Sequence, residues 1–252
     1  MTDDGWLASV ETASSEPYTE PATYTVLTHL REQIVSGRIA PGSKLRAEAL
    51  ANEMNVSRTP VRSALAVLSA EGLVTYGMNR GYTVQSMKLS DILDSIEVRA
   101  QLEGLGARLS VEMGWSAEGL AYLEQTVGRA RAILDEGRWS EEIERDWYTL
   151  NRLFHRAIQR APENLVLRSA IRMTLLYPLF GDAARLCPVV AERVPLRLRE
   201  VPDTPPEFIT VSQADHEEIL EAIRKGEADA AGALMSRHVL RTKARLHSIA
   251  TR

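Results

Sequence analysis

Three of the five histidines could together bind a metal ion, and each lies in a separate segment with a helical pattern of apolar positions. His155 follows Asn151 by four positions, and His216 and His238 each lie four positions from a leucine. Residues four apart share a face of a helix, so all three imidazoles are expected to point into a helical bundle. Converging imidazoles bind a divalent transition ion, zinc first and nickel second, and leave positions open for water or an effector. A lone buried histidine is more often a hydrogen-bonded core residue, so the metal site requires all three.

A second set of chemically capable side chains lies at the predicted start of a helix. Ser57 is placed to cap it, and Arg58, Thr59 and Arg62 occupy its first turns. Arg58 and Arg62 share a face, and each guanidinium can donate two hydrogen bonds to guanine O6 and N7. The two hydroxyls and the helix N-terminus suit DNA phosphates. The competing interpretation is an ordinary solvated surface on a small domain that binds proteins.

Supporting contacts to DNA are predicted outside this helix. Asn79, Arg80 and Gly81 lie in a tight turn between two predicted strands and would place a cation against the minor groove or the backbone. Glycine at position 81 lets the chain turn closely. Arg46 is a further candidate for a phosphate contact.

The elements that must position these residues follow from the apolar periodicity. Helices are predicted over 24–36, 47–54 and 57–71, followed by strands over 73–76 and 82–84, which together make a winged helix-turn-helix. Long amphipathic helices are predicted over 91–113, 117–136, 141–160, 165–186, 213–225 and 227–249. Predicted helix caps are Ser116, Ser140, Asn164 and Ser212. The fold class is therefore mainly α, with a winged helix-turn-helix before an all-helical bundle that binds ligands.

Charge and composition divide the chain in the same way. The segment from Tyr24 to Lys88 has eight Lys or Arg and four Glu, a net charge of +4, so the rest of the chain carries −8 within a total of −4. We expect a disordered tail over 1–21, a DNA-binding domain over 22–88 and an effector and metal domain over 89–252. One cysteine excludes a disulfide within the chain, and no signal peptide or membrane span is evident, so the expected location is the cytoplasm.

The order of residues across the first domain resembles the GntR family of bacterial regulators. The resemblance rests on Pro41-Gly42-Ser43-Lys44-Leu45, on Val56 to Leu65, and on Leu68 with Glu71-Gly72-Leu73-Val74. The helical remainder is similar to the FadR-type branch, whose C-terminal part is the FCD ligand-binding domain. The resemblance implies a DNA-binding regulator. We expect a repressor that binds an inverted-repeat operator on double-stranded DNA as a homodimer, because each recognition helix reads one half-site.

The same resemblance adds candidate ligands to the histidines. In the metal-binding subgroup of this branch an Asp-x3-His pair precedes two later histidines, which makes Asn151 the fourth ligand here, in place of Asp. Four neutral ligands leave the ion its full charge, so a small carboxylate is the expected effector. Arg99 resembles the inward-facing arginine of the branch and could clamp that anion. Arg172 and Tyr177 are further candidates for effector binding.

Three alternatives remain open from the residues alone. Arg99 could instead form a salt bridge within the bundle to Glu103, four positions on. An acyl thioester or another organic ligand could fill the bundle without a metal. A metal-dependent hydrolase would need a base beside the ion, and Glu217 is the only candidate, although its position next to His216 turns it about 100° away. The chain is therefore not expected to be an enzyme.

Overall fold

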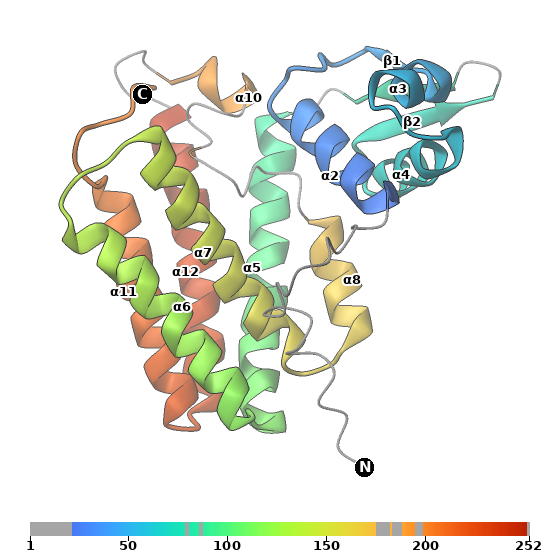
Figure 1. Ribbon diagram of the computed structural model, residues 1–252. Helices are drawn as coiled ribbons and strands as arrows, with labels where there is room; N and C mark the ends of the chain where they lie inside the picture. The colour runs from blue at the N-terminus through green and yellow to red at the C-terminus, as the bar shows by residue number, and fades with distance from the viewer. Residues whose placement is uncertain are drawn as a thin grey trace.

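The computed structural model describes residues 22–78, 81–85, 88–174, 182, 188–194 and 199–250. The elements form a small N-terminal domain with a sheet and a larger bundle of helices beside it (Figure 1). Several predictions fall outside the described residues: the tail over 1–21, Asn79 and Arg80 of the wing, and Tyr177. No helix in the described part of the chain is long and apolar enough to cross a membrane.

The N-terminal domain is the predicted winged helix-turn-helix. It contains α2 (Ala22–Val35), α3 (Ala47–Glu53) and α4 (Arg58–Ala70), with β1 (Lys44–Leu45), β2 (Val74–Gly77) and β3 (Gly81–Val84). The apolar face of α4, Val61, Leu65 and Leu68, is fully buried against residues of α2 and the sheet. A bidentate ion pair between Arg31 and Glu71, at 2.6 to 3.1 Å, joins α2 to the end of α4.

The three strands form an antiparallel sheet in the order β1-β3-β2. β2 and β3 pair from Val74 opposite Val84 to Gly77 opposite Gly81, and they flank the wing turn. Gly81 has a φ of +74°, a conformation that favours glycine, so the glycine predicted for close turning is needed there. β1 was not predicted, because two residues are too few to show an alternating pattern.

The bundle contains the helices expected from the sequence, but the prediction of one helix over 165–186 is wrong, because that helix ends at Met173 with Thr174 as its C-cap. The main helices of the bundle are α5 (Leu89–Met113), α6 (Ala117–Asp135), α7 (Glu141–Arg160), α8 (Leu165–Met173), α11 (Glu207–Arg224) and α12 (Ala228–Ala250), with the short α10 (Pro188–Ala191) before α11. Ser116, Ser140 and Asn164 cap α6, α7 and α8 as predicted, since each side chain accepts a hydrogen bond from a backbone N–H in the first turn.

The prediction that Ser212 caps its helix is wrong. α11 begins at Glu207, six residues before the predicted start at 213, and its N-cap is Pro206. The early turns are helical because Ile209, only 1% exposed, packs into a cluster with Trp139 and Trp147. This packing favours the helix over a local capping pattern.

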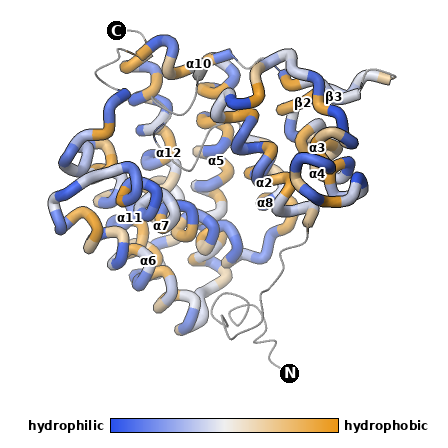
Figure 2. The backbone as a smooth tube through the Cα atoms, turned by 45° about the horizontal axis from the view of Figure 1, so that its top comes forward, coloured by the Kyte–Doolittle hydropathy of each residue, from blue (hydrophilic) through white to orange (hydrophobic). Residues whose placement is uncertain are grey.

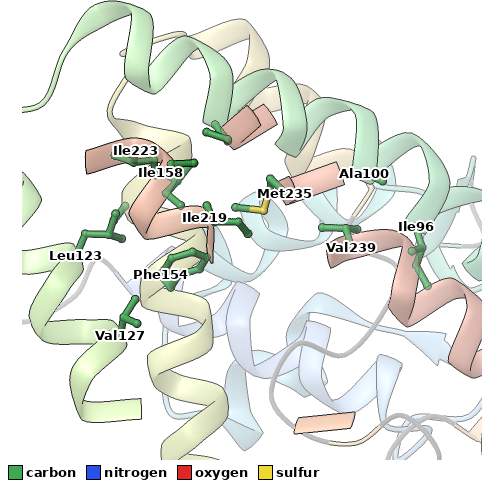
Figure 3. Packing of buried hydrophobic residues seen from close by; sticks show 14 of the residues in the cluster. Ile96, Ala100, Leu123, Val127, Phe154, Ile158, Ile219, Ile223, Met235 and Val239 are labelled. Carbon is green, nitrogen blue, oxygen red and sulfur yellow. The ribbon is translucent and has the colours of Figure 1, made fainter. Parts of the chain in front are cut away.

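Side chains from five helices fill the core of the bundle. Figure 3 shows Ile96 and Ala100 of α5 with residues of α6, α7, α11 and α12, among them Phe154, Ile219 and Met235. Hydrophobic and hydrophilic positions alternate along these helices (Figure 2), which is the amphipathic pattern that predicted them.

The closest helix contact in the bundle is between α5 and α12. A Cβ added at Gly104 would lie 2.9 Å from the carbonyl oxygen of Gly232, and one added at Gly232 would lie 3.0 Å from the carbonyl oxygen of Gly104. Only glycine at both positions therefore permits this separation of the two backbones.

We predict that Gly104→Ala destabilises the protein by about 1–3 kcal/mol, because the methyl group meets backbone rather than a mobile side chain. The matched control is Gly128→Ala in α6, where an added Cβ has no atom within 4 Å. That substitution should stabilise by about 0.5–1 kcal/mol. Urea unfolding gives both values, and equal stability of the two variants would contradict the close packing of α5 and α12.

Candidate metal centre and DNA-binding surface

The three predicted histidines meet in the bundle. His155 comes from α7, His216 from α11 and His238 from α12, and all three are buried. One ligand atom of each lies within 4.8 Å of the corresponding atoms of the others. The Nε2 atoms of His216 and His238 are 3.2 Å apart, and those of His238 and His155 are 3.3 Å apart.

Two buried carboxylates fix the orientation of these rings. His155 Nδ1 lies 2.5 Å from Oε2 of Glu103, and His238 Nδ1 lies 3.3 Å from Oδ2 of Asp215. An ionised carboxylate only accepts hydrogen bonds, so in both rings the proton sits on Nδ1 and Nε2 carries a lone pair. The two lone pairs therefore face each other across 3.3 Å.

This donor set fits a divalent cation. Zinc–nitrogen bonds of 2.0–2.1 Å in tetrahedral geometry separate neighbouring ligands by about 3.3 Å, which matches the two Nε2 separations. A cation between the rings would replace the repulsion of facing lone pairs with attraction. The hydrogen bonds from Nδ1 to carboxylates are the arrangement that holds imidazole ligands of metals in place.

The imidazoles of His216 and His238 are neutral near pH 7. Burial, followed by the charges of His238 and His155, lowers the pKa of His216 well below its usual value. Burial also lowers the pKa of His238, against the opposing hydrogen bond with Asp215. Phe154 and Trp147 flank His216, with ring centroids at 4.2 and 6.0 Å. Neutral imidazoles are the form that binds a metal.

Glu103 stays ionised although it is almost fully buried. Burial acts to raise the pKa of its carboxyl, but the charges of Arg99 and His155 and their hydrogen bonds together lower it well below its usual range. Arg99 Nε donates to Oε1 of Glu103, so the salt bridge that the sequence left as an alternative is present. Arg99, Glu103 and His155 thus form one buried chain of polar contacts.

A cavity of about 380 Å³ adjoins the histidines. His155 and His238 line it together with Arg99 and Asn151, so the structure brings the predicted fourth ligand and the predicted clamp to one space. Further lining side chains include Trp147, Tyr148, Phe208, Thr242 and Arg245. Arg172 does not line this cavity: it is exposed on α8 and donates to Ser169.

Sequence reasoning missed two parts of this site. Asp215 was given no role in the site, and Glu103 was considered only as a partner of Arg99, because the contacts of both to histidines cross between helices. One sequence signal was available for Asp215, which directly precedes His216 in the chain. Glu217, the candidate base of a hydrolase, binds Arg131 through two contacts of 2.7 Å instead.

The predicted DNA-reading residues are exposed on the N-terminal domain. Arg58, Thr59 and Arg62 project from the first turns of α4, and neither arginine forms an ion pair with any described residue. Ser57 occupies the N-cap with extended backbone but makes no capping hydrogen bond through its side chain. Arg46 precedes α3 and is also exposed.

A surface cleft of about 550 Å³ is lined by residues of the sheet and by residues in the first turns of α3 and α4. Lys44, Arg46 and Arg62 line it together with Tyr76, Gly81 and Tyr82. Three cations along a cleft beside a helix N-terminus suit a polyanionic backbone, so this surface is chemically able to bind DNA.

Comparison with known families matches both domains. The model described as bacterial regulatory proteins, gntR family, matches residues 23–84, and the model described as FCD domain matches residues 94–241. Among individual relatives, the HTH-type transcriptional repressor GlaR of Escherichia coli is 27% identical over 214 residues, which cover 84% of this chain and 89% of GlaR.

Two further similarities agree with this match. The HTH-type transcriptional regulator BphR of Paraburkholderia xenovorans is 37% identical over 131 residues, which cover 51% of this chain and about half, 53%, of BphR. The solved structure of Escherichia coli McbR/YncC has a TM-score of 0.64 at 21% identity and covers 91% of this chain and 98% of its own. The last similarity concerns the fold alone.

We predict that the metal-free protein loses stability as the pH falls below about 6.5. His216 and His238 have lowered pKa values when folded and ordinary ones when unfolded, so the unfolded chain takes up more protons and acid favours it. The test compares thermal unfolding of wild type and His216→Gln from about pH 7.5 to 5.5, with the exposed His29→Gln as control. The melting temperatures of the wild type and of His29→Gln should fall steeply as the pH is lowered, and that of His216→Gln should fall less steeply. The same slope in all three proteins would contradict the prediction.

Proposed function

The chain belongs to the GntR family of bacterial transcriptional regulators and carries an FCD domain, and on that premise we propose a repressor controlled by a small carboxylate bound at a metal ion. The family consists of DNA-binding regulators, not enzymes. The observation that carries the proposal is the convergence of three imidazole nitrogens beside a cavity that Arg99 also lines.

The proposed DNA contacts are made by α4 and the wing. Arg58 and Arg62 read guanines in the major groove, while Ser57, Thr59 and Arg46 bind phosphates. The exposure of both α4 arginines and the absence of ion pairs to described residues support this role, because neither guanidinium must leave a partner to bind DNA. GlaR is a repressor by its name, which supports repression as the outcome here.

The proposed assembly is a two-fold homodimer on an inverted repeat. Exposed apolar side chains on the neighbouring helices α5 and α8 support an interface there: Val98, Leu105, Leu165, Val166 and Met173. Apolar side chains gathered on adjoining helices are typical of a surface that a second copy covers.

The proposed metal ligands are Asn151, His155, His216 and His238, with zinc as the first choice and nickel as the second. When bound, the ion would supply a Lewis-acidic centre for an anionic ligand. Glu103 and Asp215 hold the imidazoles through Nδ1, and each carboxylate is also paired with a cation, Arg99 or Arg241. Because these acids are already paired, the charge of the ion remains to be balanced, and that favours a carboxylate effector.

Two protein groups are suited to orient that carboxylate. Arg99 uses its Nε for Glu103 and lines the cavity with the rest of its guanidinium. The indole N–H of Trp147 is buried and has no hydrogen-bond partner among the described residues, although Trp147 also lines the cavity. A buried donor without a partner is costly, so an acceptor oxygen of a ligand would satisfy it.

A route from effector to DNA runs through α7. This helix carries His155, and three residues earlier Arg152 lies within electrostatic range of Tyr24 and Glu32 on α2 of the DNA-binding domain. A ligand that binds one arrangement of the two domains better than another shifts the equilibrium between them. A coupling of about 1–3 kcal/mol changes operator affinity by roughly 5- to 150-fold.

We predict that Arg58→Ala and Arg62→Ala each weaken binding to an operator selected from random DNA by about 1–3 kcal/mol, because each removes two hydrogen bonds to a guanine. Fluorescence anisotropy at one fixed salt concentration measures the loss. Arg129→Ala, an exposed arginine on α6, is the control and should leave affinity unchanged. Unchanged affinity in both α4 variants would rule out α4 as the reading helix.

We predict that a carboxylate found by thermal-shift screening binds about tenfold more weakly to Arg99→Gln and to Trp147→Phe, since each loses one hydrogen bond to a charged group. The same carboxylate should release operator from wild type. Arg108→Gln, at an exposed position about two and a half turns further along α5, is the control. A neutral effector, or one that acts equally on all four proteins, would show that the effector does not bind in this cavity through Arg99 and Trp147.

A further inference from the structure

Four arginines form a cluster on the side of the bundle that faces the DNA-binding domain. Arg152, Arg156 and Arg160 are spaced four apart on α7 and so share one face, and Arg168 lies on the adjoining α8. Figures 1 and 2 both show α8 beside α2. We refer to these four residues as the arginine cluster.

The arginine cluster has no acidic partner among the described residues. None of the four guanidinium groups lies within ion-pair distance of a carboxylate in the described part of the chain, and the one side-chain hydrogen bond given for them there is from Arg152 to Thr149, at 3.2 Å. Arg168 Nε is buried and has no hydrogen-bond partner there. Burial lowers the pKa of Arg160, and the charges of Arg156 and Arg168 lower it further. By contrast, Arg31, Arg131 and Arg245 are each bound by a carboxylate through two contacts.

The cluster lies where the chain enters the described structure. Tyr24, in the first turn of α2, is within electrostatic range of both Arg152 and Arg160. Residues 1–21 connect directly to that turn. Their charged side chains are Asp3, Asp4, Glu11, Glu16 and Glu20, and the segment contains no Lys, Arg or His. The most acidic end of the chain is thus tethered beside its unpaired cations.

We propose that residues 1–21 dock on the arginine cluster, with Glu11, Glu16 and Glu20 paired to its guanidinium groups. The cluster extends about 12 Å along α7, eight residues at a rise of 1.5 Å. An extended chain covers about 3.3 Å per residue, so the ten residues from Glu11 to Glu20 can span the cluster. The tether keeps the local concentration of these acids high, which favours this partner over a free anion.

Docking of the tail joins the two domains. Residues 1–21 directly precede α2 of the DNA-binding domain, while three of their proposed partners belong to α7, the helix that carries His155. A docked tail therefore stabilises one placement of α2 against α7, and salt or a competing polyanion weakens it. This role does not depend on the metal or on the carboxylate effector.

Proteolysis of the full-length protein tests the proposal. Chymotrypsin cleaves after Tyr18, between Glu16 and Glu20, and mass spectrometry follows the product that begins at Thr19. At low salt this cleavage should be about tenfold slower in wild type than in Arg156→Gln/Arg160→Gln, because cleavage tracks the undocked fraction. The difference should vanish near about 0.5 M salt. Circular dichroism establishes that the variant is folded, and the control is Arg129→Gln/Arg145→Gln, which alters two exposed arginines elsewhere.

An exchange of charges completes the test. Glu16→Lys/Glu20→Lys should be cleaved fast, and adding Arg156→Glu/Arg160→Glu to it should restore slow cleavage. Equal cleavage of wild type and Arg156→Gln/Arg160→Gln overturns the proposal. Protection from cleavage that appears only at high protein concentration also overturns it, because a second copy is then the occupant of the cluster. Lower operator affinity of Arg156→Gln/Arg160→Gln with unchanged cleavage overturns it as well, because DNA is then the occupant.

Discussion

The proposed metal site depends on three buried imidazoles whose ring nitrogens converge in the bundle. Glu103 and Asp215 fix two of these rings through Nδ1, and Arg99 keeps Glu103 ionised in spite of its burial. The facing lone pairs of His155 and His238 repel each other, and a cation between the rings would replace that repulsion with attraction. The site also requires α5, α7, α11 and α12 to keep their spacing, and the glycine contact between α5 and α12 sets one of those separations.

The two domains differ in how their cations are paired, and this difference supports the proposed division into DNA binding and effector binding. On the N-terminal domain, cations around α4 and the wing cleft are exposed and left for DNA. In the helical domain, the buried Arg99 and the exposed Arg241 are bound by carboxylates, which leaves the ligand to balance the charge of the proposed metal. The arginine cluster lies between these two environments, next to α2.

Much of this could be predicted from the sequence, because apolar periodicity is local information. It gave both domain types, the three histidines and the cap of α7 at Ser140. It could not give β1, which is too short for a pattern, or the start of α11, which depends on burial of Ile209. The roles of Glu103 and Trp147 were also missed, since they arise from contacts between helices far apart in the chain.

The most direct test of the account is the X-ray absorption spectrum of tag-free protein loaded with one equivalent of zinc. We predict three imidazole nitrogens and further light atoms at about 2.0–2.1 Å around the metal, with the imidazole signal reduced in His155→Ala. A zinc shell made only of oxygen, a spectrum unchanged by His155→Ala, or failure to retain zinc would contradict the account. In that case the three histidines would be core residues without a metal.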